Sequence, residues 1–349
     1  MHRNIFVTFL ILLLQLSACN GSNEAGSPGN ASSAPLGPAQ LGVIVNDDDP
    51  LSQRIASYYM DARGIPADNL VHVRFTPGNK VMRPQAFKTL KSAVDAATPK
   101  GVQAWVLSWT APYRVGCMSI TTAFAAGFDE AFCVQGCKLT RKSPWFDSDS
   151  HRPRDDFGWR PAIMLAGETF EDVKALIDRG IASDHTSPEG TGYLVSTTDR
   201  ARNVRARYYR GTLLMQSDRF KLKVVQRNTL KYRNDVMFYF TGLAKVKDIT
   251  SNTFLPGSIA DHLTSAGGKL TGSSQMSSLR WLEAGATGSY GAVVEPCAFV
   301  EKFPRPNIVI NRYLDGETLI ESYWKSVEMP GQGVFIGEPL ATPFSNVPD

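Results

Sequence analysis

The sequence lacks the short signatures by which many nucleotide-binding proteins and hydrolases are recognised. It contains no G-x-G-x-x-G and no G-x-x-x-x-G-K-[ST] run, which removes the usual nucleotide-binding loops. Ser119, Ser196 and Ser273 lie outside any G-x-S-x-G elbow, so a serine hydrolase has no local support. Repeats of a fixed period are absent as well. No cofactor is therefore expected.

A strong charge imbalance is also missing. The chain of 349 residues carries 37 Lys and Arg against 33 Asp and Glu, which gives a formal net charge of +4. This excess is too mild to indicate a nucleic-acid partner, because binding to a phosphate backbone relies on concentrated positive charge. No nucleic-acid partner is expected.

Long apolar runs are confined to the N-terminus. Residues 5–14 form an apolar stretch behind Arg3, which is too short for a membrane-spanning helix of about 20 residues. It leads to Leu16-Ser17-Ala18-Cys19, which resembles a bacterial lipobox, where signal cleavage leaves a lipid-modified Cys as the first residue. We therefore predict a leader at 1–19, lipidation at Cys19, and an exported protein anchored to a bacterial membrane, facing the periplasm or the cell surface. The alternative is an ordinary secretory signal that is cut nearby.

The rest of the chain divides into a polar segment and a large folded part. Residues 20–40 are rich in Gly, Ser, Ala, Pro and Asn and cannot pack a core, so we predict a flexible tether. Hydrophobic residues make up 43% of the whole chain, which is enough for a large core. We expect residues 41–349 to form one domain, with a possible division into lobes at 41–190 and 191–349.

The first part of the folded region alternates strands and helices. Residues 41–46 are a continuous apolar run, which is typical of a strand buried on both faces. A helix is expected from Pro50 to just before Gly64, because Pro favours the first helical turn and Gly the end. Further segments are expected as a strand at 70–75, a helix at 84–97 and a strand at 102–109. This order predicts an α/β fold with a mostly parallel sheet and helices on both faces.

The second part continues the alternation. Strands are predicted at 160–165, 192–197, 235–241, 287–294 and 333–336, and helices at 169–179, 277–284, near 308 and at 317–327. Pro256 is expected to begin another helix, because Ser258 and Asp261 have capping-box spacing. The Arg-rich stretch 199–210 is expected to be helical. We interpret its arginines as a solvated face with Tyr208 and Tyr209 packing inward; capture of anionic groups is the alternative.

The cysteines predict disulfides. Without Cys19 the chain keeps four cysteines: Cys117, Cys133, Cys137 and Cys297. An even number in an exported protein indicates two disulfides, and three pairings are possible. Cys117 and Cys297 each follow an expected strand, so both could lie at one edge of the sheet. We predict that these two pair with each other and that Cys133 pairs with Cys137.

Metal sites receive little support from the acidic residues. Seven carboxylates occur in two groups: Asp47, Asp48 and Asp49, and then Asp147, Asp149, Asp155 and Asp156. Oxygen ligands of this kind suit Ca²⁺, but the second group lacks the Gly and the distal Glu of an EF-hand loop. A solvated loop neutralised by Arg152 and Arg154 is favoured. A zinc site is disfavoured, because His151 and Asp147 do not complete a known ligand spacing with the cysteines.

A set of polar residues follows the ends of the expected strands. Its members are Asn46, Asp47, Tyr113, Arg114, Asp129, Thr241 and Glu295. Loops after parallel strands converge at one edge of a sheet, so these residues form our candidate ligand pocket. Arg114 opposite Glu295 or Asp129 could bind a polar substrate or form an internal ion pair, and we favour the ion pair.

Five ordered segments resemble a bacterial family of exported proteins that has no assigned function. They are LGVIVNDDDPLSQRIASYYMDARGIPADNL, PYRVGCMSITTAFAAGFD, RPAIMLAG, GATGSYGAVVEPC and MPGQGVFIGEPLATPF. The resemblance covers nearly the whole chain after the tether, and it implies no particular reaction.

A more distant resemblance bears on chemistry. The order of strand, turn and helix, the strand AGATGSYGAVV and the closing Gly-Glu-Pro turn are similar to the gingipain branch of the caspase-like cysteine peptidases. In those enzymes a His-Gly pair follows one strand and a Cys follows the next, so that the imidazole can take the thiol proton. This chain has Thr241-Gly242 at the first place and residues 269–274 at the second, where neither His nor Cys occurs. The resemblance implies a caspase-like sheet without the catalytic pair.

The motifs and resemblances described above support two alternative functions. We favour a binding or assembly lipoprotein that keeps a peptidase-like fold and takes an unknown small-molecule, glycan or protein ligand. The alternative is a cysteine hydrolase in which Cys297 is the nucleophile, His262 the base and Glu295 the group that orients the imidazole.

Overall fold

The computed structural model describes residues 34–346 except residues 135 and 217. The predicted leader at 1–19, Cys19 and residues 20–33 of the predicted tether lie outside the described residues. Residues 34–40 do not behave as a free tether. Leu36 is buried and its backbone N–H donates to Glu321 Oε2, and Pro38–Gln40 form a 3-10 turn. None of the described helices is both long enough and apolar enough to cross a bilayer.

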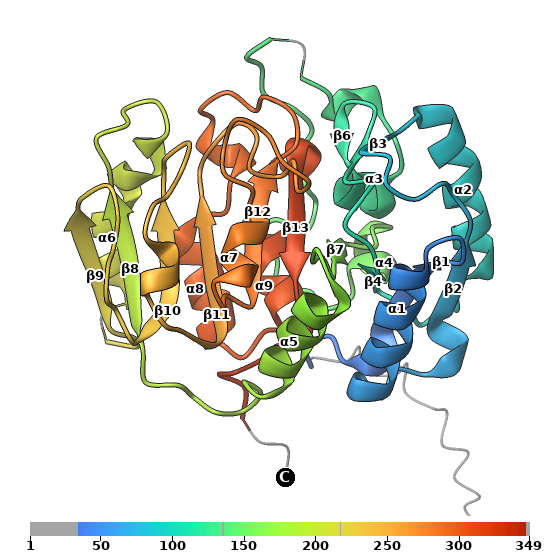
Figure 1. Ribbon diagram of the computed structural model, residues 1–349, viewed down its shortest axis with the longest axis horizontal. Coiled ribbons are helices and arrows are strands. Elements are labelled where there is room, and N and C mark those ends of the chain that lie inside the picture. Colours follow the sequence, from blue (N-terminus) through green and yellow to red (C-terminus); the bar gives the residue numbers. More distant parts are fainter. Residues whose placement is uncertain (1–33, 135, 217, 347–349) are drawn as a thin grey trace, which may run out of the picture. The chain divides into compact units, whose positions relative to one another are not determined.

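Ten strands form one sheet in the order β2-β1-β4-β7-β13-β12-β11-β10-β8-β9 (Figure 1). Their bounds are β1 Leu41–Asn46, β2 Leu70–Val73, β4 Ala104–Leu107, β7 Ala162–Met164, β8 Thr191–Ser196, β9 Leu222–Gln226, β10 Val236–Thr241, β11 Phe254–His262, β12 Gly288–Ala292 and β13 Gly333–Gly337. Strands β2, β1, β4 and β7 are parallel neighbours, as are β12, β11, β10, β8 and β9. Among the described strands of this sheet, β12 and β13 form the one antiparallel pair. The predicted α/β fold with a mostly parallel sheet is confirmed.

Helices cover both faces of the sheet, as predicted. Their bounds are α1 Pro50–Arg63, α2 Pro84–Ala97, α3 Ile120–Ala126, α4 Pro153–Phe157, α5 Phe170–Ile181, α6 Ala206–Gln216, α7 Leu279–Glu283, α8 Pro306–Leu314 and α9 Leu319–Lys325. Figure 1 shows α1, α5 and α7 in front of the sheet, with α8 and α9 behind it. Successive buried side chains of β10 therefore pack against helices on opposite faces of the sheet. Tyr239 packs with Trp281 of α7, whereas Phe238 packs with Tyr313 of α8.

The first helix shows why local sequence signals succeeded in this part of the chain. Asp49 caps α1 by accepting a hydrogen bond from the N–H of Leu51 at 3.0 Å, and Pro50 occupies the first helical position. Gly64 ends the helix in the left-handed region at φ 61°, a conformation that glycine adopts without strain. All six residues of the preceding strand β1 are buried, as its apolar run predicted.

The helix predicted from Pro256 is wrong, because this segment is the strand β11. Phe238 pairs with Ile259 and Thr241 pairs with His262 across the β10/β11 ladder. A strand between two other strands is buried on both faces, so it shows no alternation that would distinguish it from a helix. Asp261 makes no cap; it pairs with Arg205 inside the protein.

A small second sheet was not predicted. It contains β3 Val81–Met82, β5 Arg114–Val115 and β6 Met118–Ser119, with β5 in the middle. Each strand is only two residues long, which is too short for a periodic signal. The 10-stranded sheet extends across the expected lobe boundary near residue 190, and the described residues belong to one compact unit that begins at Ala34.

Candidate functional site

The loops after β8, β10, β11 and β12 lie at one edge of the sheet, because these strands are parallel neighbours. Residues 263–278 connect β11 to α7, and we call them the β11–α7 loop. This loop borders three cavities, of about 220, 450 and 530 Å³. The candidate site is built around it.

The cavity of about 450 Å³ is distinguished by the positive charge of its lining. Its lining residues are Lys80, Val81, Tyr113, Arg114, Ala266, Lys269, Gly272, Ser273 and Ser274. It thus lies between the small sheet and the β11–α7 loop. No carboxylate lines it, whereas three of its residues are cationic. We call it the cation pocket.

Backbone pairing positions the cations of this pocket. In the small sheet Arg114 is paired with Val81, so Lys80 and Arg114 come from adjacent strand ends. The N–H of Tyr113 donates to the carbonyl of Lys80 at 3.3 Å, which ties the two segments together. On the opposite side the N–H of Gly272 donates to the carbonyl of Lys269 at 3.0 Å. Gly272 has φ 110°, a value that favours glycine at this turn.

The charges of the cation pocket are not neutralised within the described part of the chain. Lys80, Arg114 and Lys269 make no ion pair with any of the described carboxylates, and the buried Nε of Arg114 has no hydrogen-bond acceptor. Lys245 and Lys247 also pair with no described carboxylate, and they line the neighbouring cavity of about 530 Å³ together with Glu168, which pairs with Arg280. Cations gathered in a concave site create a local positive potential, which attracts anions.

The smallest of the three cavities contains Glu295 and Cys297. It has a volume of about 220 Å³ and is also lined by Arg202, Thr264 and Ser265. The Nε of Arg202 donates to Thr264 Oγ1 at 3.1 Å, and its Nη1 pairs with Asp199 at 2.9 Å. Because Arg202 is already paired, this cavity offers less free positive charge than the cation pocket.

The structure does not bring His262 and Cys297 together as a nucleophile and its base. The Cys297 sulfur is bonded to Cys137. The His262 ring is buried: its Nδ1 accepts from Trp281 Nε1 at 2.9 Å and its Nε2 contacts the carbonyl of Met276 at 3.1 Å. Both ring nitrogens are therefore engaged, and Nε2 carries the proton of a neutral imidazole. Burial lowers the pKa of His262 from 6.5 to about 4.

This buried histidine leads to a prediction about acid stability. The folded pKa of His262, about 4, lies below the value of 6.5 for the exposed ring, so the unfolded chain takes up the proton first as the pH falls. We expect the ring to contribute a loss of roughly 2–3 kcal/mol in the free energy of unfolding between pH 7 and pH 4.5. The measurement is urea denaturation at both pH values, for the wild type and His262→Gln. The free energy of unfolding of His262→Gln should fall less between the two pH values than that of the wild type. An equal fall in both proteins would contradict the assignment of His262 as a buried, neutral imidazole.

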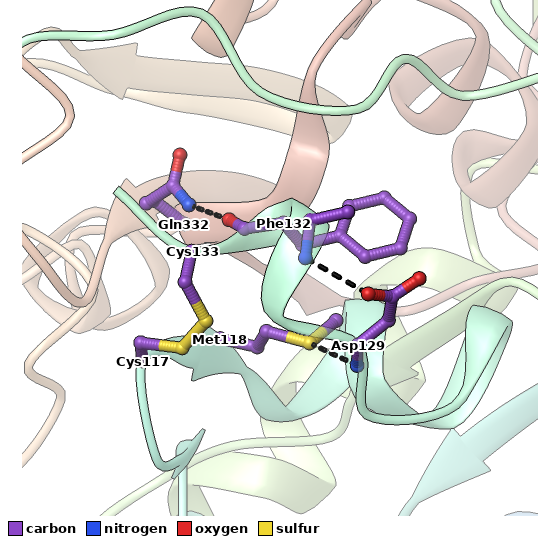
Figure 2. Close-up of a disulfide and its surroundings, with 7 residues drawn as sticks. Cys117, Met118, Asp129, Phe132, Cys133 and Gln332 are labelled. Atoms are coloured by element: carbon purple, nitrogen blue, oxygen red, sulfur yellow. Dashed lines mark hydrogen bonds between the residues drawn. A yellow bond between two sulfur atoms is a disulfide. The ribbon is translucent and has the colours of Figure 1, made fainter. Parts of the chain in front are cut away.

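The disulfides have a connectivity other than the predicted one. Cys117 is bonded to Cys133 and Cys137 to Cys297, with Cα–Cα separations of 5.4 and 5.5 Å. Figure 2 shows the first bond, in which the chain returns from α3 so that Cys133 lies over Cys117. The predicted pairing was wrong because the ends of strands indicate an edge of the sheet but not the path of the loops at that edge. Two disulfides indicate an oxidising environment outside the cytoplasm.

The residues of the predicted pocket are dispersed. Tyr113 and Arg114 line the cation pocket, whereas Glu295 lines the cavity of about 220 Å³ and accepts from the N–H of Cys297 at 2.8 Å. Thr241 is fully buried at the end of β10. The predicted ion pair of Arg114 with Glu295 or Asp129 does not form.

Three other predicted pocket residues have structural contacts. Asp129 pairs with Arg141 at 2.7 Å. Asn46 is buried and exchanges hydrogen bonds with the backbone of Phe75, at 2.9 and 3.1 Å. The Asp47 carboxylate contacts the His72 ring at 2.7 Å. Side chains that serve the backbone or an ion pair in this way are not available to a ligand.

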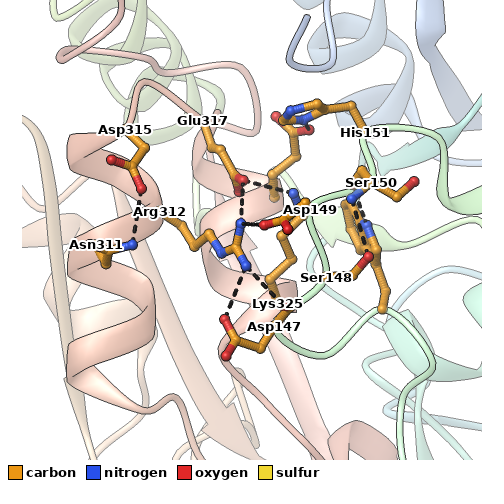
Figure 3. A network of polar contacts seen from close by, with 12 residues as sticks. Asp147, Ser148, Asp149, Ser150, His151, Asn311, Arg312, Asp315, Glu317 and Lys325 are labelled. Carbon is orange, nitrogen blue, oxygen red and sulfur yellow. Dashed lines mark hydrogen bonds and ion pairs between the residues drawn. The ribbon is translucent and has the colours of Figure 1, made fainter. Parts of the chain in front are cut away.

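The acidic loop around residue 149 is held by ion pairs. Figure 3 shows Arg312 of α8 between Asp147 and Asp149, with N–O distances of 3.1 and 2.6 Å. Behind them Lys325 pairs with Glu317 at 2.8 Å. Over the residues that the structure describes, no three His, Cys, Asp or Glu side chains are grouped as metal ligands. Arg152 pairs with Asp155 at 2.6 Å, as predicted, whereas Asp147 and Asp149 are bound by an arginine from a distant helix, which the sequence does not indicate.

Sequence reasoning missed two of the three pocket cations. Lys269 is the first residue of the segment 269–274, in which the expected Cys is absent. Lys80 follows the turn Pro77-Gly78-Asn79 and belongs to no recognisable motif. Tyr113 and Arg114 were found because they follow a strand. No local pattern links Lys80 to a residue almost 200 positions away, so only the folded chain reveals the pocket.

Only the comparison with solved structures bears on the fold. No family model matches the chain, and no curated protein matches it in sequence. The structure is similar to that of the Arg-specific cysteine proteinase gingipain R, with a TM-score of 0.51 over 87% of this chain and 78% of that chain, at 8% identity. A second solved structure, a protease, has a TM-score of 0.42 over 89% of this chain and 80% of that chain, at 10% identity. The fold is thus gingipain-like, and this likeness by itself establishes no activity.

Proposed function

We propose that this protein is an exported binding protein that captures an anionic ligand in the cation pocket. The observation that carries the proposal is a set of three cations, Lys80, Arg114 and Lys269, that pair with no described carboxylate and surround one cavity without a carboxylate among its lining residues. Its volume of about 450 Å³ falls within the usual range of small-molecule sites. The lipid anchor predicted at Cys19 would hold such a protein at a membrane.

The chemistry of the pocket favours carboxylate, sulfate or phosphate groups. A guanidinium can form two parallel hydrogen bonds to such a group, and lysine ammonium groups add point charges. The hydroxyl of Ser274 offers a further donor beside them, whereas that of Ser273 already donates to the carbonyl of Gln275 at 3.0 Å. A small molecule, or the end of an acidic glycan or peptide, with two or more anionic groups would match this arrangement.

The contacts of His262 and Cys297 do not support the alternative function, a cysteine hydrolase. A cysteine hydrolase needs a thiolate beside an imidazole that can accept its proton. The imidazole of His262 is enclosed by Trp281 and Met276, and Cys297 is part of a disulfide. We therefore favour ligand binding over hydrolysis as the activity of this fold.

The proposal predicts the behaviour of three single variants. Isothermal titration of the mature protein with citrate, inorganic phosphate and a sulfated disaccharide should identify at least one anion that binds. Lys80→Ala, Arg114→Ala and Lys269→Ala should each weaken that binding about tenfold, because each removes one charge-assisted hydrogen bond of about 1.5 kcal/mol. Added salt should weaken it further.

A matched control separates this pocket from general surface charge. Lys100 is exposed, lies just beyond the end of α2 and is not among the residues that line the cation pocket. Lys100→Ala removes the same charge and should leave the affinity unchanged. If the three pocket variants bind the anion as well as the wild type does, the cation pocket is not the ligand site and the proposal is wrong.

A further inference from the structure

Helix α6 has an exposed side that combines apolar and basic residues. Its inner side packs against β8, β9 and α8 and buries Tyr209, Thr212 and Gln216. Its outer side, which we call the α6 outer face, consists of Arg207, Tyr208, Arg210, Gly211, Leu214 and Met215. The exposed fraction is 72% for Leu214, 66% for Met215 and 46% for Tyr208. Tyr208 was predicted to pack inward, and this prediction is wrong.

The exposed apolar residues are concentrated on this face. Seven large hydrophobic residues in the described chain are exposed, and three of them, Tyr208, Leu214 and Met215, belong to α6. Leu214 and Met215 follow Arg207 and Tyr208 by seven residues, so they lie on the same side of the helix two turns later. Adjacent exposed apolar side chains of this size indicate an interaction surface.

The two charged residues of the α6 outer face, Arg207 and Arg210, are both positive. Arg207 and Arg210 form no ion pair with a described carboxylate, and α6 itself contains no acidic residue. The Arg207 guanidinium lies over the ring of Tyr208, 4.8 Å from its centroid. By contrast Arg205, in the turn just before α6, is buried and paired with Asp261. The two outer arginines are therefore free to meet an anionic surface.

We propose that the α6 outer face docks on an anionic lipid surface. Arginines can bind lipid headgroups while Leu214 and Met215 enter the boundary between headgroups and acyl chains, and a tyrosine suits the interface between these layers. Charge complementarity favours this occupant over a second copy of the chain, since two α6 outer faces would bring four arginines together. The inference is independent of the cation pocket.

Amide hydrogen exchange of the full mature chain tests this proposal. With vesicles that contain phosphatidylglycerol, exchange in residues 206–216 should slow roughly fivefold or more, because the anionic surface attracts the basic residues and docking stabilises the helix. With vesicles of phosphatidylcholine alone it should remain unchanged. A lipid anchor would attach the protein to both kinds of vesicle, so the comparison reports on α6 and not on the anchor.

Three variants complete the test. Leu214→Ser/Met215→Ser and Arg207→Glu/Arg210→Glu should each abolish the slowing, whereas Lys88→Glu/Lys100→Glu makes the same charge change near α2 and should retain it. Unchanged exchange of 206–216 with anionic vesicles overturns the proposal. Slow exchange that depends on protein concentration without vesicles also overturns it, because it identifies a second copy as the occupant.

Discussion

Changing Asp261 to Asn should lower the free energy of unfolding by about 3–5 kcal/mol, the range observed when one partner of a buried ion pair is removed. Asp261 Oδ1 accepts a hydrogen bond of 2.5 Å from Arg205 Nη2, and the two side chains are 1% and 2% exposed. The neutral amide of the Asp261→Asn variant would leave the Arg205 guanidinium buried without a counter-charge, because arginine does not lose its proton in proteins. Urea denaturation at neutral pH measures the loss.

The same pair also stabilises the edge of the sheet that carries the candidate site. The Nη2 of Arg205 donates to the carbonyl of Thr241 at the end of β10, and its Nη1 donates to the carbonyl of Pro304. Asp261 stands next to His262 at the end of β11. Loss of the pair should therefore loosen the ends of β10 and β11 before the rest of the sheet.

A double-mutant cycle separates the ion pair from general disruption. The variant Arg205→Met/Asp261→Asn buries no unpaired charge, so it should lose clearly less stability than the sum of the two single changes. The control is Arg219→Met, which breaks an exposed pair with Asp315 and should cost at most about 1 kcal/mol. Equal losses at Asp261 and Arg219 would contradict the claim that burial makes the first pair critical.

Removing the Cys137–Cys297 bond should also have a large effect. The bond closes a loop with a sequence separation of 160, whereas Cys117–Cys133 closes one of 16. In the chain-entropy description the longer loop restricts the unfolded chain more, which corresponds to about 5 kcal/mol against about 3 kcal/mol. We therefore expect Cys137→Ala/Cys297→Ala to be less stable than Cys117→Ala/Cys133→Ala in the same denaturation experiment.

The observed pairing can be distinguished from the predicted one on the same protein without reduction. Cleavage after Glu130 and after basic residues separates Cys117 from the peptide that carries Cys133 and Cys137. The structure requires these two peptides and the one with Cys297 to remain joined as a set of three. The pairing predicted from the sequence would instead release the Cys133–Cys137 peptide alone. A reactive thiol at Cys297 in the unreduced protein would contradict the disulfide and favour the hydrolase alternative.

Local signals explain which elements could be predicted. Strand β1 and helices α1 and α2 were placed correctly, because capping residues, prolines and apolar spacing all indicate the same boundaries. Strand β11 was mistaken for a helix, since its central position in the sheet removes the alternation on which a strand prediction depends. Strand β9 was missed, because it is a short edge strand whose residues are mostly exposed.

Of the residues that line the cation pocket, the sequence predicted only two, Tyr113 and Arg114. Tyr113 and Arg114 follow β4, so the rule that sites form after parallel strands located them. The same rule also selected Asn46 and Asp129, whose side chains are occupied by the Phe75 backbone and by Arg141. Chain order indicates where a side chain emerges, but hydrogen-bond partners decide whether it remains free for a ligand.

The sequence by itself determined the class of fold and the even set of cysteines, because helix caps, apolar runs and residue counts are properties of short segments. Tertiary structure alone decided which cysteines pair, that Arg205 meets Asp261 inside the protein, and that Lys80, Arg114 and Lys269 surround one cavity. These contacts join residues far apart in the chain. Their geometry depends on how the whole sheet and its loops pack, and no local pattern encodes it.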